Sequence, residues 1–209
     1  MKTFLRATVV LFLAACTGSA TAEPPTQEAP PLKANQAEAI FAGGCFWCME
    51  GPFDKVNGVI STSSGYTGGP EAGASYKQVS AGKTGHYEAL RVVYDPSKVS
   101  YDALLQTFWH NIDPTQSNGQ FCDRGKHYRS AIFSSNPEEV ALAKASKLKV
   151  AAELGQEVVT EILKSGPFWL AEEYHQDFYK KNPSHYARYR KGCGRDKRLQ
   201  ELWGESAPH

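Results

Sequence analysis

The sequence predicts an α/β or α+β sandwich in which helices pack against a mixed sheet. Strand-like and helix-like runs alternate from residue 37 onward, and this alternation is the main observation behind the prediction. Hydrophobic residues make up 41% and charged residues 22% of the 209 residues, which are globular proportions. Length and composition together indicate one ordinary domain with an appendage, and they exclude a collagen-like, coiled-coil or largely disordered chain.

Five strands are predicted from short apolar runs that turn residues bound. The first run ends at Gly43-Gly44, the second at the turn Gly65–Gly69, and the third at Asp95-Pro96. The predicted strands are Glu38–Gly43, Val59–Tyr66, Tyr87–Tyr94, Arg129–Ser134 and Glu157–Lys164.

Helices are predicted between these strands. One begins at Ser100, has apolar residues at helical spacing, and ends at Asp113-Pro114. Another has Asn136 at its N-cap and Pro137 at its first position, and it ends at Gly155. From residue 172 on, an aromatic and basic segment with short helices forms a C-terminal tail. Two earlier helical segments are predicted at Cys45–Lys55 and Ser75–Ala81.

The N-terminus predicts a secretory signal. Lys2 and Arg6 precede the apolar run Ala7–Ala15, which is too short to span a bilayer. Leu13-Ala14-Ala15-Cys16 is similar to a bacterial lipobox, so residues 1–15 are predicted to be a lipoprotein-type signal peptide and Cys16 the lipidated residue. The alternative is cleavage after Ala22, which would release a soluble periplasmic protein.

Residues 16–36 are rich in Pro, Glu, Ala and Thr, and we predict a flexible tether there, followed by the folded domain over residues 37–209. The expected location is the envelope of a bacterium, with the protein anchored to the membrane by lipid and facing the periplasm. A net charge of +1 gives no electrostatic reason to expect a nucleic-acid partner.

Cys45 is the first candidate for a reactive residue. It follows a predicted strand and a double glycine, and it opens a predicted helix. The positive end of a helix dipole lowers a thiol pKa and favours the nucleophilic thiolate. Phe46 and Trp47 place two large aromatic side chains beside it, which suits an apolar substrate group such as a methyl. The alternative is an inert, buried cysteine on a core helix.

Cys45 and Cys48 also form a C-x-x-C motif, which leaves two other interpretations open. A thioredoxin-like dithiol has this same strand-to-helix context. A zinc site needs four ligands, usually from two paired motifs, whereas Cys122 and Cys193 stand alone in the sequence. We therefore expect no metal, and without a P-loop or dinucleotide fingerprint we expect no cofactor.

Glu88 is the candidate acid. Strand alternation places it on the same face as Leu90 and Val92, and a carboxyl that enters an apolar face has a raised pKa. Such a carboxyl, protonated near neutral pH, can act as a general acid. The alternative is a glutamate at a strand end that points to water. Three further residues at predicted loop edges are most simply packing residues or turn formers: Tyr66, Tyr128 and Asp123.

Six short segments occur in an order that one protein family shares. They are Gly43–Trp47, Ser64–Gly69, Thr84–Ala89, Asp113–Gln116, Tyr128–Ile132 and Glu173–Gln176. Together they resemble the A-type peptide-methionine sulfoxide reductase family. The resemblance covers roughly residues 37 to 204, and it implies a ferredoxin-like α+β core with a mixed sheet and long loops.

The resemblance also implies an activity and a set of residue roles. The substrate would be the S epimer of methionine sulfoxide, free or in proteins. Cys45 would be the nucleophile and would become a sulfenic acid, while Glu88 would protonate the sulfoxide oxygen. The remaining roles are methyl binding by Phe46 and Trp47, hydrogen bonds to the oxygen from Tyr66 and Tyr128, and orientation of the site by Asp123.

A second thiol would then form a disulfide with Cys45, and a thioredoxin-like dithiol would reduce it. Cys193 is favoured as this resolving cysteine because flanking glycines let it swing and because the family often carries a mobile cysteine there. Cys48, where the family commonly has Gly, lies within disulfide range one helical turn away. Cys122, beside Asp123, is the third candidate.

Two other functions remain open at this stage. A general thiol-disulfide oxidoreductase would use Cys45 and Cys48, but it would leave Glu88 and the tyrosines unexplained. A lipid-anchored module could bind oxidised or Met-rich surfaces without turnover. In each case we expect a monomer.

Overall fold

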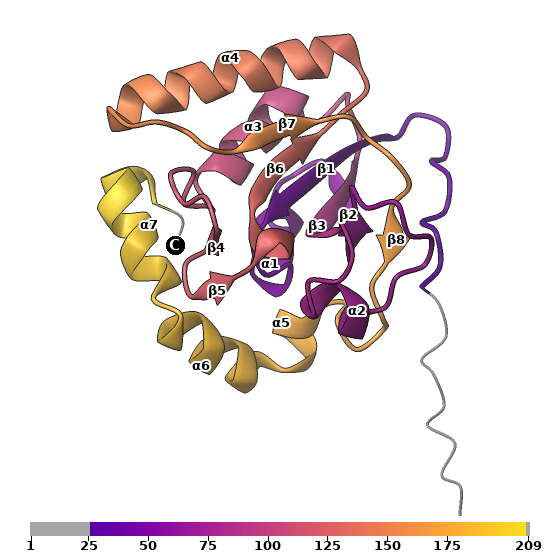
Figure 1. The fold of residues 1–209 in the computed structure, drawn as a ribbon. Helices are drawn as coiled ribbons and strands as arrows, with labels where there is room; N and C mark the ends of the chain where they lie inside the picture. Colours follow the sequence, from indigo (N-terminus) through magenta and orange to yellow (C-terminus); the bar gives the residue numbers. More distant parts are fainter. Residues whose placement is uncertain (1–25, 208–209) are drawn as a thin grey trace, which may run out of the picture.

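The computed structural model describes residues 26–207, and its centre is a mixed six-stranded sheet. The strands follow the order β7-β6-β1-β3-β2-β8 (Figure 1). β6 and β7 pair in parallel, whereas the other neighbouring strands are antiparallel. The strands are β1 (Ala37–Gly43), β2 (Val59–Thr67), β3 (Tyr87–Tyr94), β6 (Ser130–Phe133), β7 (Glu161–Leu163) and β8 (Trp169–Leu170).

Two helices connect the four central strands. α1 (Trp47–Asp54) joins β1 to β2, and α3 (Tyr101–Trp109) leads from β3 toward β6. The resulting order β6-β1-β3-β2 is that of a ferredoxin-like core, so the predicted α+β fold class is confirmed. The other helices are α2 (Tyr76–Ser80), α4 (Pro137–Leu154), α5 (Phe178–Lys181), α6 (Pro183–Gly192) and α7 (Arg195–Trp203), with 3-10 turns at Lys126–Tyr128 and Gly204–Ser206.

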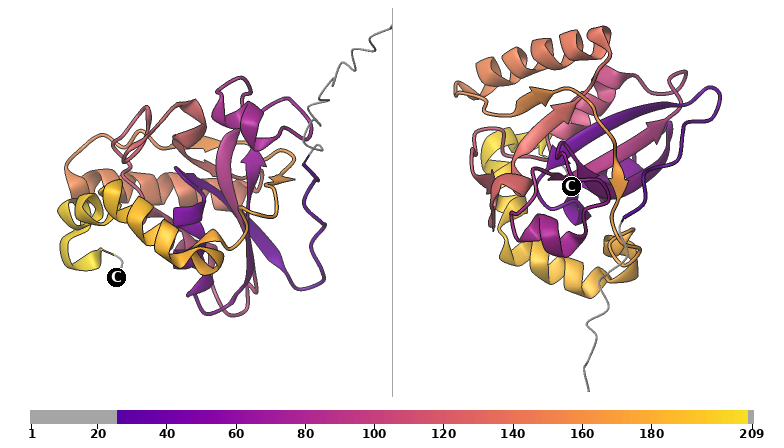
Figure 2. Two further views of the ribbon diagram at one scale, coloured as in Figure 1. Left: turned by 90° about the horizontal axis from the view of Figure 1, so that it is seen from below. Right: turned by 45° about the vertical axis from the view of Figure 1, so that its right-hand side comes forward.

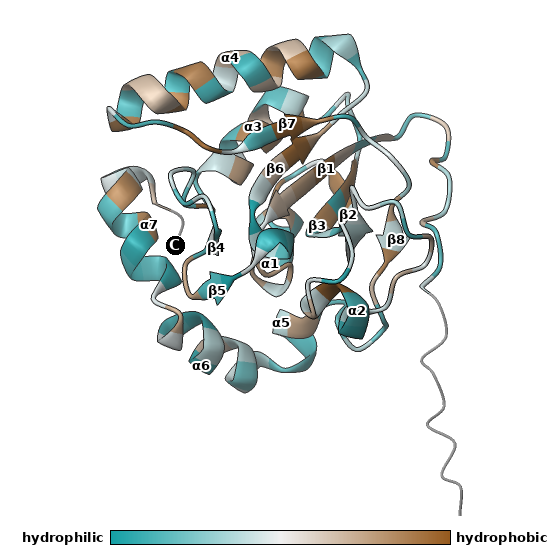
Figure 3. Ribbon diagram, viewed as in Figure 1, coloured by the Kyte–Doolittle hydropathy of each residue, from teal (hydrophilic) through white to brown (hydrophobic). Residues whose placement is uncertain are grey.

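β1 shows how the sheet is buried on both faces. Ala39 and Phe41 belong to the main core, which α1, α3, α4 and α7 complete. Ile40 and Ala42 point to the opposite face, where Phe168 belongs to the smaller core. Burial of a side chain such as Phe41 contributes about 1.5–3 kcal/mol. Figure 3 shows that the sheet is more apolar than the C-terminal helices: β6 and β7 have apolar colour, whereas α6 and α7 have mostly polar colour.

The predicted start and end of α4 are confirmed. The Asn136 side chain accepts a hydrogen bond from the Glu138 N–H at 2.9 Å, and Pro137 occupies the first helical position. Gly155 ends the helix with φ of 60°, the left-handed conformation that glycine adopts without a steric penalty.

Four short strands differ from the sequence predictions. The polar loop before Tyr128 contains a two-stranded sheet, β4 (Gly119–Gln120) and β5 (Asp123–Arg124). β8 is also new, and the strand expected over Glu157–Lys164 is reduced to β7. Each is a strand of two or three residues, and its partner lies far away or in a tight turn, so hydrophobic periodicity does not reveal it.

The last part of the expected tether lies against the domain. Thr26 donates from its hydroxyl to the Ala74 carbonyl at 3.0 Å, and Glu28 pairs with Trp169 in an isolated bridge. Residues 26–29 therefore have partners in the domain that their composition does not indicate. The predicted signal peptide and Cys16 lie outside the described residues. Among residues 26–207, no helix combines the length and the apolar character needed to cross a bilayer.

The C-terminal tail wraps one edge of the molecule. α6 and α7 follow each other along the side that carries β4 and β5, away from β8 (Figures 1 and 2). This path brings residues from the end of the chain to the loop after β1.

Candidate active site

Two glycines place Cys45 directly after β1. A Cβ atom at Gly43 would lie 2.5 Å from Met49 Sδ, and one at Gly44 would lie 2.5 Å from Gln120 Cβ. Gly44 also has φ of +84°, a conformation that favours glycine. The chain therefore turns sharply out of the core strand and brings Cys45 to the position just before α1.

Cys45 and Cys48 are free thiols that are both buried, with 6% and 1% exposure. Their side chains hydrogen-bond to each other, and the Cys48 N–H donates to the Cys45 carbonyl at 3.0 Å. Burial raises the pKa of Cys45, and the neighbouring Cys48 raises it further. The hydrogen bond from Cys45 lowers the pKa of Cys48 to about 6. The pair therefore shares one proton and one negative charge near neutral pH.

This arrangement corrects the prediction of a lowered pKa at Cys45. The prediction considered the helix dipole, but α1 begins only at Trp47 and the thiol lies in apolar surroundings. Desolvation of the charged form outweighs the dipole there.

Arg195 supplies positive charge to the sulfur pair. Its guanidinium is buried, donates to the Gly43 carbonyl at 3.0 Å and to the Asn111 carbonyl at 2.7 Å, and lies over the Phe121 ring. The two carbonyl groups and the ring are uncharged, so they do not neutralise the positive charge of the guanidinium. That charge is one of the causes that lower the pKa of Cys48.

Glu88 lies beside Cys45, as the strand alternation predicts. Its side chain is buried on β3, and Oε2 accepts a hydrogen bond from the Phe46 N–H at 3.3 Å. The Tyr128 side chain hydrogen-bonds to the same carboxyl. Burial, reinforced by the charge of Asp123, raises the pKa of Glu88 to about 8. Glu88 therefore carries its proton at neutral pH and can donate it within the site.

Aromatic rings form the other side of the site. Trp47 stacks on Phe178 with ring centroids 3.7 Å apart, and the Tyr189 ring lies nearly perpendicular to the indole with its centroid 5.8 Å away. Phe46 is buried with its ring 4.9 Å from that of His175. The Trp47 indole donates to His175 Nδ1 at 3.0 Å, which fixes the orientation of the indole. These rings form an apolar wall beside Cys45 and Glu88.

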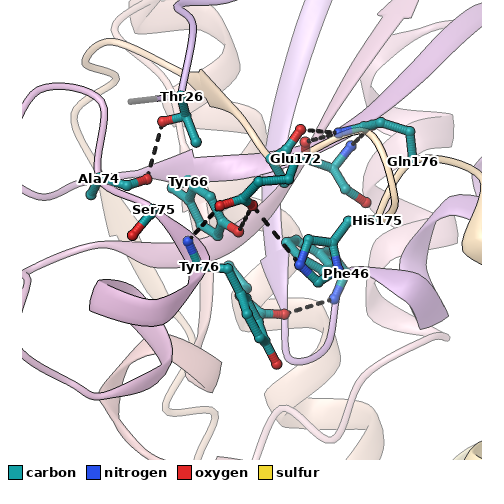
Figure 4. A network of polar contacts seen from close by, with 12 residues as sticks. Thr26, Phe46, Tyr66, Ala74, Ser75, Tyr76, Glu172, His175 and Gln176 are labelled. Atoms are coloured by element: carbon teal, nitrogen blue, oxygen red, sulfur yellow. Dashed lines mark hydrogen bonds and ion pairs between the residues drawn. The ribbon is translucent and has the colours of Figure 1, made fainter. Parts of the chain in front are cut away.

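Tyr66 belongs to a polar network around Glu172, which Figure 4 shows. The Tyr66 hydroxyl donates to Glu172 Oε2 at 2.9 Å, and Glu172 Oε1 accepts from the Tyr76 N–H at 2.8 Å. His175 Nε2 lies 3.9 Å from the same Oε2. Because a phenol has one proton, Tyr66 directs its proton to Glu172 in this state.

Asp123 lies between the buried thiols and a disulfide. Its Oδ2 accepts a hydrogen bond from the Tyr189 hydroxyl at 2.6 Å, and Tyr189 is also hydrogen-bonded to Cys45. Cys122 and Cys193 form the disulfide, with Cα atoms 5.0 Å apart. The disulfide joins the β4–β5 turn to the junction of α6 and α7. Tyr189 therefore connects the buried sulfur pair to the region of the disulfide.

The family model described as "Peptide methionine sulfoxide reductase" matches residues 37–207. The chain belongs to this family. The peptide methionine sulfoxide reductase MsrA 2 of Rhizobium meliloti (strain 1021) is 48% identical over 178 residues, which are 85% of this chain and 89% of that protein. The MsrA of Bacillus subtilis (strain 168) is 51% identical over 169 residues, covering 79% of this chain and 95% of that protein.

Solved structures of the family share the fold. Mxr1 from Saccharomyces cerevisiae in reduced form is 31% identical with a TM-score of 0.68, over 76% of this chain and 91% of that one. Methionine sulfoxide reductase A of Corynebacterium diphtheriae is 32% identical with a TM-score of 0.66, over 72% and 77% of the two chains. The resemblance drawn from the six segments is thus confirmed.

Within this reductase fold the predicted site residues are not all arranged as expected. Cys45, Phe46, Glu88 and Tyr128 come together in one site, whereas the hydroxyl of Tyr66 is bonded to Glu172. Of the three candidate resolving cysteines, Cys122 and Cys193 are joined to each other, and Cys48 alone is a free thiol. The roles of these residues stay predictions.

Four residues of the reductase site were not among the candidates that the sequence predicts: Tyr76, Glu172, Tyr189 and Arg195. Glu172 immediately precedes one of the six matching segments, which was its only hint. The described residues also hold one group of three possible metal ligands, Cys122, Asp123 and Cys193, with ligand atoms within 4.8 Å of one another. The two sulfurs of this group are bonded to each other in the disulfide, so neither is a thiolate that could bind a metal ion.

Proposed function

We propose that the chain reduces the S epimer of methionine sulfoxide, free or in proteins, to methionine. The single observation that carries this proposal is the buried Glu88, whose pKa burial raises to about 8, beside the Cys45–Cys48 pair. A sulfoxide oxygen leaves sulfur only after protonation, so reduction needs an acid and a thiolate in one apolar site. The membership of the chain in the methionine sulfoxide reductase family supports the same activity.

The methyl group of the substrate lies between Phe46 and Trp47, and the sulfoxide oxygen points to Glu88. Glu88 donates its proton to that oxygen while the Cys45 thiolate attacks the substrate sulfur. The oxygen passes to Cys45, which becomes a sulfenic acid, and methionine leaves. Tyr128, bonded to the Glu88 carboxyl, donates to the oxygen as it gains negative charge, and Asp123 orients the site.

Tyr66 takes part in this step through a change of partner. Its proton is directed to Glu172 when no substrate is bound, so donation to the sulfoxide oxygen requires the hydroxyl to turn away from Glu172. Until then, Glu88 and Tyr128 are the donors on the oxygen side.

Cys48 has two roles in the proposed cycle. As the thiolate of the pair, it accepts the Cys45 proton and leaves Cys45 as the nucleophile. Once Cys45 is a sulfenic acid, the Cys48 thiol gives up the proton that it took from Cys45 and its sulfur attacks Cys45; a disulfide forms, and the departing hydroxide takes up that proton to become water. Cys193 was favoured from the sequence for this second role, but its sulfur is bonded to Cys122, whereas Cys48 is free and in contact with Cys45.

A thioredoxin-like dithiol then returns two electrons and two protons to the enzyme. With the predicted lipid anchor at Cys16, the substrates are oxidised proteins of a bacterial envelope, and the protein acts there as a monomer. Mass spectrometry of the membrane fraction tests the anchor, because an acylated Cys16 is expected as the first residue of the mature chain. A mature chain that begins at Glu23 in the soluble periplasm would contradict it.

The paired free thiols support one other candidate, a general thiol-disulfide oxidoreductase. The decisive experiment measures turnover of the two epimers of a methyl sulfoxide separately, with dithiothreitol as the reductant, next to reduction of insulin disulfides. The proposed function predicts turnover of the S epimer alone. Rapid insulin reduction with no methionine formation would support the alternative instead.

A further inference from the structure

The disulfide at Cys122–Cys193 lies at the surface, in contrast to the thiols at Cys45 and Cys48. Cys122 is exposed and Cys193 half-buried. Asp123 contacts both ends of the disulfide region, with Oδ2 4.0 Å from Cys193 Sγ and Oδ1 3.7 Å from Cys122 Sγ. The sulfur of Cys122 is therefore more accessible to the thiol of another protein than the sulfurs of the buried pair, which are 6% and 1% exposed.

Most of the exposed charges near the disulfide are positive. Five cationic side chains within five residues of Cys122 or Cys193 are exposed: Arg124, Lys126, Arg188, Lys191 and Lys197. Of the two carboxylates nearest in sequence, Asp196 is exposed but ion-paired with Arg190 at 2.6 Å, and Asp123 is half-buried with the Tyr189 hydroxyl at 2.6 Å. The sulfur that a partner can reach therefore has a basic border, formed by the β4–β5 turn and the end of α6.

We propose that this basic border around Cys122–Cys193 is the docking surface for a protein dithiol whose reactive cysteines are flanked by acidic side chains. The proposal rests on the proposed function, and it adds where the reductant binds and what charge it carries. Complementary charge raises the encounter rate between two proteins, and it matters most at low salt.

Electrons enter the protein at this surface by thiol-disulfide exchange. A thiolate of the partner attacks the exposed Cys122 Sγ, the Cys122–Cys193 bond breaks, and Cys193 leaves as a thiolate that takes up a proton. The second partner thiol attacks the mixed disulfide, so the partner becomes a disulfide and Cys122 a thiol. The enzyme has gained two electrons and two protons.

The reduced Cys193 then passes the electrons inward. Gly194 has φ of +70°, and nothing lies within 4 Å of a Cβ built there or at Gly192, so the segment has space to move. The Cys193 thiolate attacks the Cys45–Cys48 disulfide, and Cys122 closes the exchange. The two buried thiols are regenerated and the outer disulfide reforms. Free Cys45 and Cys48 beside a bonded Cys122–Cys193 are the state that this sequence leaves behind.

The test uses three dithiol peptides with one Cys-Gly-Pro-Cys core, flanked by Glu, by Gln or by Lys. Each peptide serves as the reductant for the full-length enzyme with a methyl sulfoxide substrate. At about 0.01 M salt, where the Debye length is about 30 Å, we expect kcat/KM for the Glu peptide to exceed that for the Gln peptide by about tenfold. The Lys peptide should be slowest, and about 1 M salt should remove the differences.

Two matched double variants locate the effect. Lys126→Glu with Lys191→Glu reverses the charge beside the disulfide, and it should reverse the order of the peptides. Lys144→Glu with Lys149→Glu makes the same change on exposed positions of α4, and it should leave the order unchanged. Dithiothreitol, which carries no charge, should support equal turnover in all variants.

The outcomes separate the docking proposal from the proposed function. Equal kcat/KM for the three peptides at low salt, with normal turnover by dithiothreitol, would overturn the docking proposal alone. Loss of the peptide preference in the α4 variant would also overturn it. No methionine from the wild-type enzyme with dithiothreitol would instead overturn the proposed function.

Discussion

The two sulfur pairs of this protein differ in burial, spacing and oxidation state. Cys45 and Cys48 are separated by three residues, lie in the interior and are free thiols. Cys122 and Cys193 are separated by 71 residues, lie at the surface and are bonded. The comparison teaches that the surroundings, rather than the residue type, distinguish the two pairs: the inner pair lies beside a buried acid and aromatic rings, and the outer pair lies beside solvent and exposed positive charge.

Replacement of the inner nucleophile is expected to have the largest effect. Cys45→Ser should abolish reduction of the S epimer, because a serine hydroxyl is not deprotonated near neutral pH. Methionine released in a single turnover is the measurement. More than a few per cent of the wild-type yield would show that another sulfur performs the first step.

Glu88→Gln should slow the chemical step by about 10²–10⁴-fold, the usual contribution of a general acid. Glutamine preserves the shape of the side chain and its acceptor for the Phe46 N–H, so the fold should be retained. Rapid-quench measurement of methionine formation tests this, with circular dichroism as the control for folding. A rate equal to that of the wild type would show that Glu88 supports the fold and takes no part in the chemical step.

The single-turnover rate should depend on pH in a bell shape. It should rise as pH increases through about 6, where the inner pair gains its thiolate, and fall as pH increases through about 8, where Glu88 loses its proton. In Glu88→Gln the alkaline limb should disappear while the acid limb remains. An unchanged alkaline limb in that variant would assign the limb to a different group.

Arg195→Met removes the buried charge beside the inner pair. Loss of its hydrogen bonds to the Gly43 and Asn111 carbonyls should lower the free energy of unfolding by about 1–3 kcal/mol. The acid limb of the pH profile should also move to higher pH, because the Cys48 thiolate loses a positive neighbour. Lys149→Met on exposed α4 is the control, for which neither the unfolding midpoint nor the pH profile should change.

The outer pair should have the smallest effect on the first turnover. The double variant Cys122→Ser with Cys193→Ser should release its first methionine at the wild-type rate, since neither sulfur contacts the proposed substrate pocket. Repeated turnover with the acidic dithiol peptide should slow markedly. A first turnover slower than wild type would place an outer cysteine in the inner chemistry.

The inner site was largely predictable from the sequence. Strand alternation placed Glu88 on a buried face, and the double glycine placed Cys45 between a strand and a helix. Both signals are local, so the residues that produce them lie within a few positions of the site. The raised pKa of Cys45 was not predictable, because it depends on how much of the whole fold covers the thiol.

The outer pair and the polar network were less accessible to sequence reasoning. Two single cysteines 71 residues apart carry no sign that they pair, since the path of α6 and α7 decides it. Glu172 reaches Tyr66 from 106 residues away, and no periodicity connects them. The interaction that changes the interpretation of Tyr66 therefore appears only once the chain is folded.

The order in which the two sulfur pairs are oxidised tests the central claim most directly. One equivalent of the S sulfoxide is added to the fully reduced enzyme, samples are quenched and alkylated at increasing times, and the disulfides are mapped by mass spectrometry. The account predicts that Cys45–Cys48 forms first and then decays as Cys122–Cys193 appears. A direct Cys45–Cys193 disulfide as the first product, with Cys48 alkylated throughout, would contradict it.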